Sequence, residues 1–409
     1  PAPAPARPPP SAPSPAGAPV VRVGLLVDTT RVSVSASSGM EVVESGSGRV
    51  LGRIAAGEAA TVSSPGSTTL VVSAAGREIA RSGSGPLLLR AADAAGGEGI
   101  ISIAGKPYRG DAMVRAAGGG RVTAINLVDM ERYLLGVVPR EIGRVGPELF
   151  EAAKAQAVAA RTYAFKYLGR RESLGFDVFA TVQDQVYGGA EAEHEPVSRA
   201  VRATAGEILT YAGQPIEAYY HSTCAGRTAA IEEVWNQGPV PYLKSVVDVN
   251  PATGDAWDVT SSRYRWTQRW TGTELTQILN RTLADSFPAG VRSIGELRDL
   301  QVLRRTPSGR IGALRIEGSN AAVTVGGDRV RWILPVSLGG AILNSSKFDV
   351  EVLREPGSQR VREVVASGGG WGHGIGMCQV GAMGRARAGQ DYRTILSAYY
   401  RDTELRDLY

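Results

Sequence analysis

The chain has three histidines and two cysteines, and two of the histidines lie close in sequence to the cysteines. His221 and Cys224 stand in YYHSTCAG, and His373 and Cys378 stand in GGGWGHGIGMCQ. Two imidazoles and two thiols would suit a tetrahedral zinc ion if the two segments meet in the fold. Their spacings differ from those of common zinc motifs, so a disulfide between the two cysteines is the simpler interpretation.

Nucleophilic catalysis by the same residues is disfavoured. Ser222 and His373 could belong to a hydrolytic triad, but no G-x-S-x-G elbow accompanies them. A cysteine nucleophile would need a partner base close in space, and the sequence identifies none.

Glu141 is a candidate general acid. It lies in YLLGVVPREIG, at the end of an apolar, strand-like run and two residues after Pro139. A carboxyl in a partly desolvated cleft has a raised pKa and can donate a proton near neutral pH. On residue physics alone, a solvated loop glutamate is the more ordinary alternative.

The second candidate segment, residues 367–384, reads SGGGWGHGIGMCQVGAMG and contains eight glycines. It has no GxGxxG register and no GK[ST], so neither nucleotide-binding motif applies. Glycine permits a positive φ and lets another backbone or a ligand approach closely. The alternative is a glycine-rich connector, but Trp371, His373, Cys378 and Gln379 argue against it because flexible linkers rarely carry such residues.

A β-rich region precedes these motifs. Between residues 20 and 103, short alternating runs such as RVSVSA and MEVVES are separated by Gly, Ser and Pro clusters, which is typical of strands and hairpins. The pattern continues through YRGDAMVRAAGGGRVTAINLV, which predicts two further strands about a glycine-rich turn.

Helices are expected next to Glu141 and next to the segments that contain the histidines and cysteines. Pro147 and Gly169 bound an alanine-rich segment, which predicts a long helix soon after Glu141. An amphipathic helix is expected over residues 194–206, ahead of two strands, the second of which runs into YYHSTCAG. Asp391 is expected to N-cap a last helix over YRTILSAYY.

The expected fold class is α+β. It comprises a β-rich N-terminal module (20–106), a mixed sheet-plus-helix catalytic core (107–256 and 349–409) and a small inserted α+β domain (257–348). Residues 1–19 form a Pro/Ala-rich linker of the kind that follows a removed export signal or anchor.

Composition excludes two classes of function. The net charge of +5 on 409 residues is mild and no Lys/Arg cluster is interleaved with aromatic residues, so nucleic-acid binding is not expected. No run approaches eighteen uninterrupted apolar residues, so no membrane span is expected.

Five segments resemble the SpoIID/LytB family, the family of stage II sporulation protein D. They occur in the family's order between residues 107 and 409, and they are LLGVVPREIG, EAAKAQAVAARTYAF, ATVQDQVYGG, ATAGEILTYAGQPIEAYYHSTCAGRTA and GGGWGHGIGMCQVGAMGRARAGQDYRTILSAYY.

The resemblance implies a peptidoglycan lytic transglycosylase that cleaves the bond between N-acetylmuramic acid and N-acetylglucosamine. The family's essential glutamate, in its VVP-x-E motif, falls on Glu141. One carboxyl suffices as acid and then base, because the muramic acid's own 6-hydroxyl is the acceptor and a 1,6-anhydro end results. A hydrolase would need a second carboxylate.

Motif position in the family also implies residues that line a sugar-binding groove. They are Arg161, Gln185, Tyr187, His221, Ser222, Trp371, His373 and Gln379. Trp371 is expected to stack on a pyranose face. For each residue the alternative role is support of the core.

The two cysteines depart from the family's commonest pattern, in which serine occupies both positions. Because the shared fold should bring the two motifs together beside the cleft, the resemblance predicts a disulfide between Cys224 and Cys378, consistent with an oxidising, exported location. Zinc held by His221, Cys224, His373 and Cys378 is the alternative, since some relatives carry zinc near this region. No other cofactor is expected.

Two rival functions accompany the resemblance. One is a non-catalytic wall-binding modifier of an amidase, the role for which the LytB branch is named, and the other is a true hydrolase. The expected partners are peptidoglycan glycan strands, including strands stripped of stem peptides, and a cell-wall amidase. The expected location is extracellular or at the cell envelope.

Overall fold

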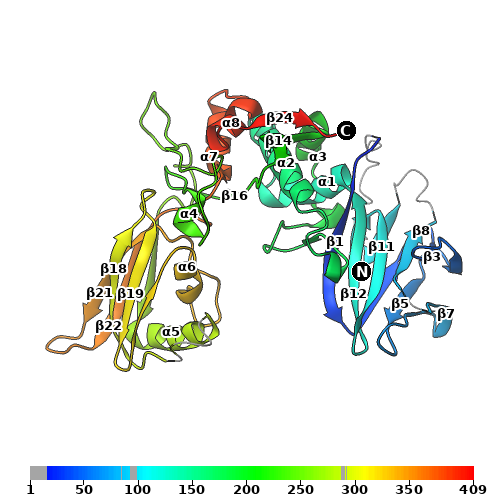
Figure 1. Ribbon diagram of the computed structural model, residues 1–409, viewed down its shortest axis with the longest axis horizontal. Helices are drawn as coiled ribbons and strands as arrows, with labels where there is room; N and C mark the ends of the chain where they lie inside the picture. Colours follow the sequence, from blue (N-terminus) through cyan, green and yellow to red (C-terminus); the bar gives the residue numbers. More distant parts are fainter. Residues whose placement is uncertain (1–15, 84, 93–98, 287–290, 292) are drawn as a thin grey trace, which may run out of the picture. The chain divides into compact units, whose positions relative to one another are not determined.

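The computed structural model describes residues 16–83, 85–92, 99–286, 291 and 293–409. Most of the linker predicted over residues 1–19 lies outside this part of the chain. The chain forms two compact units, which are described separately: the first unit is residues 1–217 and 405–409, and the second unit is residues 218–404. Strands and helices occur in both units, which confirms the α+β class (Figure 1).

The first unit contains two large sheets. The seven-stranded sheet has the order β13-β1-β12-β11-β8-β3-β4, and the six-stranded sheet has the order β10-β9-β2-β5-β6-β7. Apolar and polar residues alternate along these strands because one face of each is buried, as in RVSVS of β2. The strands are β1 (Val20–Thr29), β2 (Arg31–Ser35), β3 (Met40–Glu44), β4 (Val50–Ile54), β5 (Ala59–Ser63), β6 (Val71–Ala74), β7 (Arg77–Arg81), β8 (Leu87–Ala91), β9 (Ile100–Ile103), β10 (Lys106–Arg109), β11 (Asp111–Gly118), β12 (Arg121–Asp129) and β13 (Val178–Phe179).

The N-terminal module predicted over residues 20–106 is continuous with the rest of the first unit. β1 pairs with β12 along most of its length and with β13 at Val23 and Gly24. Strands from residues 20–29, 121–129 and 178–179 therefore belong to one sheet, and the structure places no boundary near residue 106.

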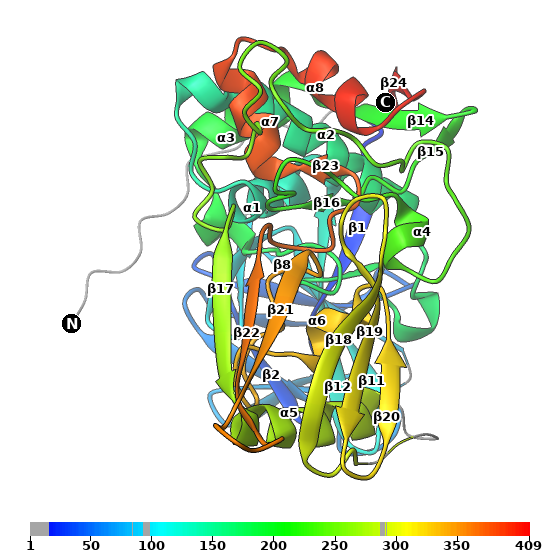
Figure 2. The same cartoon turned by 90° about the vertical axis from the view of Figure 1, so that its left-hand side faces the viewer.

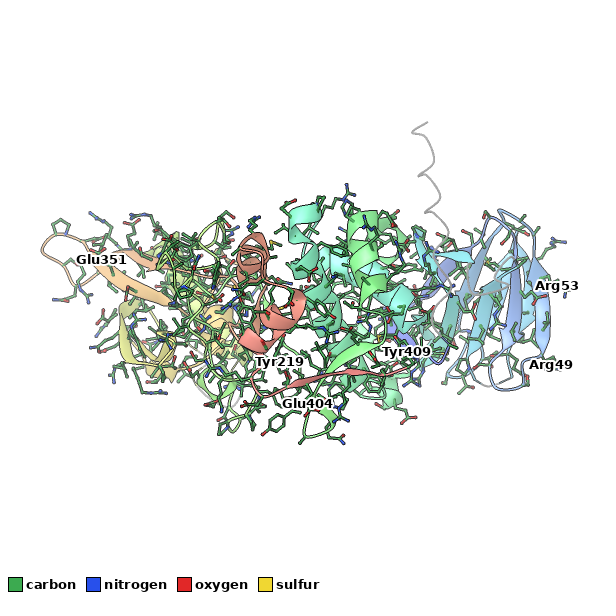
Figure 3. The ribbon with its side chains drawn as sticks, turned by 90° about the horizontal axis from the view of Figure 1, so that it is seen from above. Arg49, Arg53, Tyr219, Glu351, Glu404 and Tyr409 are labelled. Atoms are coloured by element: carbon green, nitrogen blue, oxygen red, sulfur yellow. The ribbon has the colours of Figure 1, made fainter. Side chains whose placement is uncertain are left out.

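Two arginines lie at the outer strand β4 of the seven-stranded sheet, Arg53 within the strand and Arg49 just before it, and Figure 3 labels both. Arg53 forms an ion pair with Glu41, and Arg49 forms one with Glu44. Charged side chains on an edge strand oppose pairing with a strand of another molecule.

Three α-helices complete the first unit, namely α1 (Met130–Glu141), α2 (Phe150–Lys166) and α3 (Glu195–Ala203). α1 follows β12 directly, and Asp129 caps it by accepting a hydrogen bond from the N–H of Arg132 at 3.0 Å. The strand-like interpretation of YLLGVV was wrong: this segment is helical, and because every residue of α1 from Met130 to Pro139 is buried, YLLGVV lacks the alternation of apolar and polar residues that marks an amphipathic helix. The predicted helices α2 and α3 are confirmed.

The remaining elements of the first unit are short. They are the 3₁₀ helices η1 (Pro147–Leu149), η2 (Glu172–Leu174) and η3 (Gly189–Ala192) and a small sheet of β14 (Glu207–Tyr211), β15 (Gln214–Pro215) and β24 (Glu404–Asp407).

The second unit contains two three-stranded sheets and one parallel pair, as Figure 2 shows. The sheets are β17-β22-β21 and β18-β19-β20, and the pair is β16-β23. The elements are β16 (Tyr220–His221), α4 (Ile231–Val234), β17 (Trp266–Thr271), α5 (Gly272–Ser286), β18 (Leu297–Arg305), β19 (Ile311–Gly318), β20 (Ala322–Val325), α6 (Arg329–Ile333), β21 (Phe348–Arg354), β22 (Val361–Gly368), β23 (Met377–Cys378), α7 (Gln379–Arg387) and α8 (Tyr392–Tyr399).

The core of the second unit extends past the predicted insertion. Trp270, Leu275 and Leu314 pack in one cluster with Phe348 and Val364. The register pairs residues 266–271 with 363–368, so the boundary expected at residue 348 cuts through a sheet. None of the helices in the described ranges is long and apolar enough to cross a membrane.

Candidate functional site

Glu141 ends helix α1 and is half-buried. Its Oε1 accepts a hydrogen bond of 2.8 Å from the backbone N–H of Val186. The helix continues hydrogen bonding to this point, since the N–H of Ile142 bonds to the carbonyl of Val138. The candidate acid therefore sits on a rigid element and is oriented by a backbone donor from a distant loop.

Gln185 and Tyr187 flank that donor, and both side chains are buried. Gln185 accepts from the hydroxyl of Tyr133 at 3.0 Å and donates to the carbonyl of Ala160 at 3.2 Å. The hydroxyl of Tyr187 donates to Asn126 at 2.9 Å. These bonds hold the 185–187 segment against α1 and α2, which favours a bracing role over the predicted contact with sugar.

Close packing of the tyrosine against α1 explains the glycine in LLGVVPREIG. A Cβ at Gly136 would lie 2.5 Å from the ring of Tyr187. A larger residue would push the 185–187 segment away from the helix, and Val186 with it. Gly136 thus helps to set the distance between Glu141 and its donor.

Arg161 is also fully buried. Its Nε and Nη2 donate to the two oxygens of Glu131 at 2.7 and 2.8 Å, and the guanidinium also donates to the carbonyls of Val201 and Glu207. The bidentate pair joins α1 to α2, and the two bonds to carbonyls tie α2 to α3 and to the first residue of β14. The placement favours the bracing alternative for Arg161.

Sequence reasoning missed Asp184. Its carboxylate is inaccessible and accepts from the N–H of Phe179 at 2.8 Å and the hydroxyl of Tyr163 at 3.1 Å, and it pairs with Arg171 at 2.9 Å. These bonds fix the loop that ends at Val186. The sequence feature that could have identified Asp184 is its place as the one acidic residue of the QDQVYGG motif.

In the second unit, the two cysteine-containing segments meet, as the resemblance implied. β16 and β23 pair in parallel, with His221 opposite Cys378 (Figure 2). Thr223 and Trp371 exchange backbone hydrogen bonds of 3.0 and 2.8 Å. The glycine-rich segment is therefore an ordered partner of the HSTC segment.

Its glycines are required by this close approach. Gly376 has φ +69°, and a Cβ there would lie 2.0 Å from the carbonyl oxygen of Tyr219. Gly372 has φ +111°, and a Cβ there would lie 2.8 Å from the Cβ of His221. Both positions combine a left-handed backbone with contact to the neighbouring strand.

The two cysteines are buried free thiols, so the predicted disulfide is not formed in this structure. Sγ of Cys378 accepts from the N–H groups of Cys224 and Gly381, both at 3.3 Å. The thiol of Cys224 donates to Asp248 at 3.4 Å. Burial raises the pKa of both thiols above the ordinary value. The sulfurs are close together, as a bridge would require, and the pairing itself stays a prediction.

The chemistry of this cluster fits zinc. Donor atoms of His221, Cys224 and Cys378 all lie within 4.8 Å of one another. Nδ1 of His221 lies 3.2 Å from the carbonyl of Ile375, which leaves the buried Nε2 without a partner in the described part of the chain. Zinc-bound histidines commonly have one nitrogen oriented in this way. These three residues would hold the ion, which would cross-link the two segments.

His373, the fourth residue of the expected zinc set, is not part of that group. Its Nδ1 accepts from the N–H of Ile375 at 3.0 Å, and its ring lies 5.3 Å from that of Trp235 and 5.6 Å from that of His221. Burial lowers the pKa of His373 to about 4, so the ring is neutral at pH 7.

The other candidates of the second unit differ in exposure. Trp371 is 46% exposed, and the guanidinium of Arg263 lies 5.1 Å from its ring centroid. Gln379 is buried, and Ser222 is half-buried with its hydroxyl 3.2 Å from that of Thr223. Trp371 is thus the candidate best placed to meet a ligand.

Two aspartates beneath the thiols also escaped the sequence analysis. Asp258 accepts from the N–H groups of Ala225 and Gly226, and Asp248 accepts from the hydroxyl of Tyr399 at 2.8 Å and pairs with Arg385 at 2.9 Å. Burial raises the pKa of Asp248. Asp248 in VVDVN and Asp258 in AWDVT stand alone in the sequence and belong to no recognisable motif, so the sequence did not mark them as site residues.

One pocket of the second unit has an aromatic lining. It has a volume of about 460 Å³, and Trp235, Asn236, Asp328, Arg329 and Trp332 line it. Trp332 is 57% exposed, and its Nε1 donates to Asp328 at 3.1 Å. The exposed indole of Trp332 and the half-buried indole of Trp235, beside planar polar groups, suit the binding of sugars.

The fold and these motifs define a member of the SpoIID family, and comparison with known proteins shows that the chain belongs to it. A family model described as stage II sporulation protein matches residues 118–211, and a model described as a domain of unknown function matches residues 253–376.

Three relatives illustrate the range of the family. Stage II sporulation protein D of Bacillus subtilis is 30% identical over 301 residues, which cover 69% of this chain and 76% of the relative. An uncharacterised protein of Brachyspira hyodysenteriae is 32% identical over 291 residues, 69% of this chain and 68% of the relative. The amidase enhancer of Bacillus subtilis is 31% identical over 299 residues, 66% of this chain and 40% of the relative.

Proposed function

We propose that the protein acts on the bacterial cell wall as a lytic transglycosylase of peptidoglycan glycan strands, with Glu141 as its single general acid and base. The observation that carries the proposal is the carboxyl of Glu141, which lies half-buried in the family's VVP-x-E motif and is oriented by the N–H of Val186. Because peptidoglycan is its substrate, the protein would work outside the cytoplasmic membrane.

The hydrogen bond to Val186 suggests how the two oxygens of Glu141 divide their roles. A backbone N–H pairs with an unprotonated oxygen, so the acidic proton belongs on Oε2. That proton passes to the leaving glycosidic oxygen as the bond from C1 breaks. The carboxylate then takes the proton of the muramic acid 6-hydroxyl, O6 bonds to C1, and the 1,6-anhydro ring and the acid form together.

Aromatic side chains of the second unit support glycan binding. The exposed ring of Trp371 and the pocket containing Trp235 and Trp332 offer flat apolar surfaces beside amide, carboxylate and guanidinium groups. Sugar rings pack on such surfaces through their C–H faces while their hydroxyl and acetamido groups form hydrogen bonds.

A second candidate function comes from the amidase enhancer of Bacillus subtilis, which is 31% identical to this chain. In that case the protein would bind the wall and stimulate an amidase without cleaving glycan. The two functions predict different products.

The deciding experiment incubates denuded and peptide-bearing glycan strands with the wild type, Glu141→Gln and Glu148→Gln, and identifies the products by mass. Glu148 is an exposed glutamate seven residues away and serves as the matched control. We expect anhydro ends from the wild type and Glu148→Gln, and none from Glu141→Gln. Reducing muramic ends would indicate a hydrolase. Unaltered strands together with faster amidase cleavage would indicate the modifier.

A further inference from the structure

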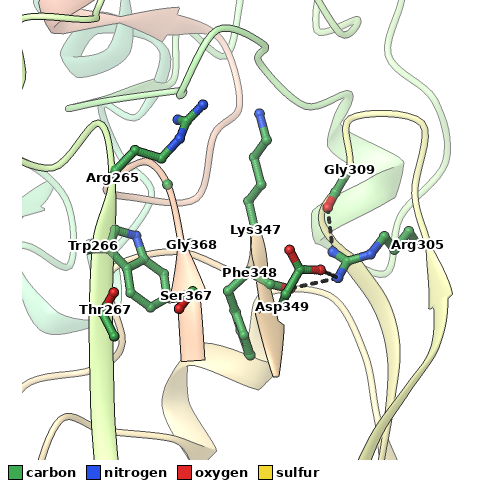
Figure 4. Close-up of a pocket in the computed structure, with 11 residues that line it drawn as sticks. Arg265, Trp266, Thr267, Arg305, Gly309, Lys347, Phe348, Asp349, Ser367 and Gly368 are labelled. Atoms are coloured by element: carbon green, nitrogen blue, oxygen red, sulfur yellow. Dashed lines mark hydrogen bonds and ion pairs between the residues drawn. The ribbon is translucent and has the colours of Figure 1, made fainter. Parts of the chain in front are cut away.

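A positively charged pocket lies in the second unit, where β17, β21 and β22 meet. It has a volume of about 740 Å³, with Trp266 and Gly368 in its wall (Figure 4). Lys347, Arg265 and Arg305 contribute three cations to its lining, and Asp349 contributes the one carboxylate among the lining residues. No role in the proposed reaction uses this pocket.

Only one of the three cations is neutralised. Arg305 pairs with Asp349 and also donates to the carbonyls of Gly309 and Phe348, as the dashed lines of Figure 4 partly show. Its charge and its donors are therefore accounted for within the protein.

Lys347 and Arg265 form hydrogen bonds to backbone carbonyls, and the guanidinium of Arg265 also lies over the ring of Tyr264, 4.1 Å from its centroid. Nζ of Lys347 donates to the carbonyl of Ala225 at 2.8 Å, and Nη1 of Arg265 donates to the carbonyl of Tyr264 at 2.8 Å. Within the described residues, neither side chain forms an ion pair. Figure 4 shows the two side chains extending in the same direction, Arg265 from the residue before β17 and Lys347 from the residue before β21.

A third uncompensated cation lies behind them. Arg310 is 1% exposed, and none of its three guanidinium nitrogens has a hydrogen-bond partner in the described part of the chain. It packs against the glycine-rich segment, where a Cβ at Gly374 would lie 1.9 Å from Nη2. Burial lowers the pKa of Lys347, and the charges of Arg310 and Arg265 lower it further, while Asp258 raises it in part, so neighbouring cations act on Lys347.

Such an arrangement is costly without an anion. A charge removed from water loses its hydration, and like charges nearby add repulsion; an opposite charge with hydrogen bonds offsets both effects. Among the described residues, the structure supplies a carboxylate in ion-pair contact for Arg305 but none in such contact with Lys347, Arg265 or Arg310. The group that completes the pocket is therefore an anion.

We propose that this pocket binds an anionic group of a cell-wall polymer, with Lys347 and Arg265 as direct donors and Arg310 as a fixed positive charge behind them. The ligand chemistry is a carboxylate or phosphate oxygen. The wall has two sources: the lactyl carboxylate of muramic acid and the phosphates of polyol-phosphate polymers. The identity of the polymer rests on the proposed function; the anion site itself does not.

The test measures binding by calorimetry to the full chain carrying Glu141→Gln, so that no probe is consumed. The probes are a peptide-free tetrasaccharide of alternating N-acetylglucosamine and N-acetylmuramic acid, the uncharged N-acetylglucosamine tetramer, and glycerol 3-phosphate. The test variant carries Lys347→Met and Arg265→Gln together in that Glu141→Gln chain, and the control carries Arg269→Gln in the same chain. Arg269 lies on the same strand as Trp266, is exposed and is not among the residues that line the pocket.

We expect at least one anionic probe to bind about tenfold more weakly to the double variant, as the loss of a charge-assisted hydrogen bond predicts. The uncharged tetramer and the Arg269→Gln control should be unaffected. Weaker binding of the carboxylated tetrasaccharide identifies muramic acid as the source of the anion, and weaker binding of glycerol 3-phosphate identifies a phosphate polymer.

Equal binding of every probe by the parent and the double variant would overturn the proposal, as would an equal loss in Arg269→Gln. If the double variant does not fold, Arg265→Gln alone supplies the test because that side chain is exposed. A wild type that binds the anion here but leaves glycan uncut would remove the proposed function and keep the pocket.

Discussion

The backbone N–H of Val186 donates to Oε1 of Glu141 at 2.8 Å, across 45 residues of sequence. Gln185 and Tyr187 on either side are locked by Tyr133 and Asn126, so the donor cannot move independently of the helix that carries the acid. Residues that the family motifs suggest as sugar ligands thus act here on the position of the acid.

Glu141→Asp tests the importance of that position. The shorter side chain retains the carboxyl but draws it back from Val186 and from the substrate, so we expect glycan cleavage to fall by roughly 10²-fold or more, within the range for general acid catalysis. The free energy of unfolding should change little because Glu141 is only half-buried. Cleavage rates on denuded strands and urea unfolding measure the two effects. Wild-type rates in Glu141→Asp would contradict the assigned role.

Arg161→Met tests the buried pair with Glu131. Removing one partner leaves a buried carboxylate without its charge partner, so we expect a loss of about 3–5 kcal/mol in the free energy of unfolding. Changing Glu131 to Leu in the same chain should recover part of the loss. Arg199→Gln, at an exposed position of α3, is the control. If the Arg161–Glu131 pair does not contribute to the free energy of unfolding, Arg161→Met and the control will be equally stable in urea unfolding.

Gly376→Ala tests the packing of the glycine-rich segment. Gly389 also has a positive φ of +84°, but a Cβ there meets no atom within 4 Å, so Gly389→Ala measures the backbone effect alone at about 1–2 kcal/mol. At Gly376 the clash with the carbonyl of Tyr219 adds to that effect, and we expect a larger fall in thermal stability. Equal falls in melting temperature would show that the strand contact is unimportant.

The cluster of His221, Cys224 and Cys378 predicts zinc retention. We expect about one zinc ion per chain after purification with added zinc and a mild reductant, and loss of the ion in Cys224→Ser or His221→Gln. Metal content is measured by mass spectrometry, and a chelator should lower the melting temperature of the wild type. A zinc-free protein whose thiols react with an alkylating agent only after reduction would instead establish the disulfide.

The lowered pKa of Glu233 predicts that the free energy of unfolding depends on pH, which the variant Glu233→Gln tests. Burial tends to raise the pKa of Glu233, but hydrogen bonds from Ser308, Thr306 and Ala230 outweigh it and lower the pKa. A lowered carboxyl pKa stabilises the folded protein above the unfolded value and loses that contribution as the pH falls through the folded value.

The expected difference between the wild type and Glu233→Gln is about 1 kcal/mol at pH 7 for this partly exposed group, and it should shrink below about pH 4.5. Urea unfolding across this range measures it, with Glu232→Gln as the exposed neighbouring control. A difference that stays constant with pH would show that the charge of Glu233 is not involved.

Elements whose signals are local could be predicted from the amino-acid sequence. The alanine-rich helix α2 between Pro147 and Gly169, the cap of Asp391 on α8 and the alternating strands of the first unit follow from propensity, capping and burial period, which act over a few residues. The resemblance to the family's VVP-x-E motif singled out Glu141, and the scarce histidines and cysteines singled out the two cysteine-containing segments.

Tertiary structure alone decided what those residues do. α1 is a helix although YLLGVV within it is an apolar run, because neighbouring elements bury every residue from Met130 to Pro139. Arg161 became a brace because Glu131 lies opposite it, whereas the guanidinium of the buried Arg310 has no hydrogen-bond partner in the described part of the chain. Each outcome depends on partners many residues distant, and the free energy of a buried charge is set by those partners rather than by its neighbours in sequence.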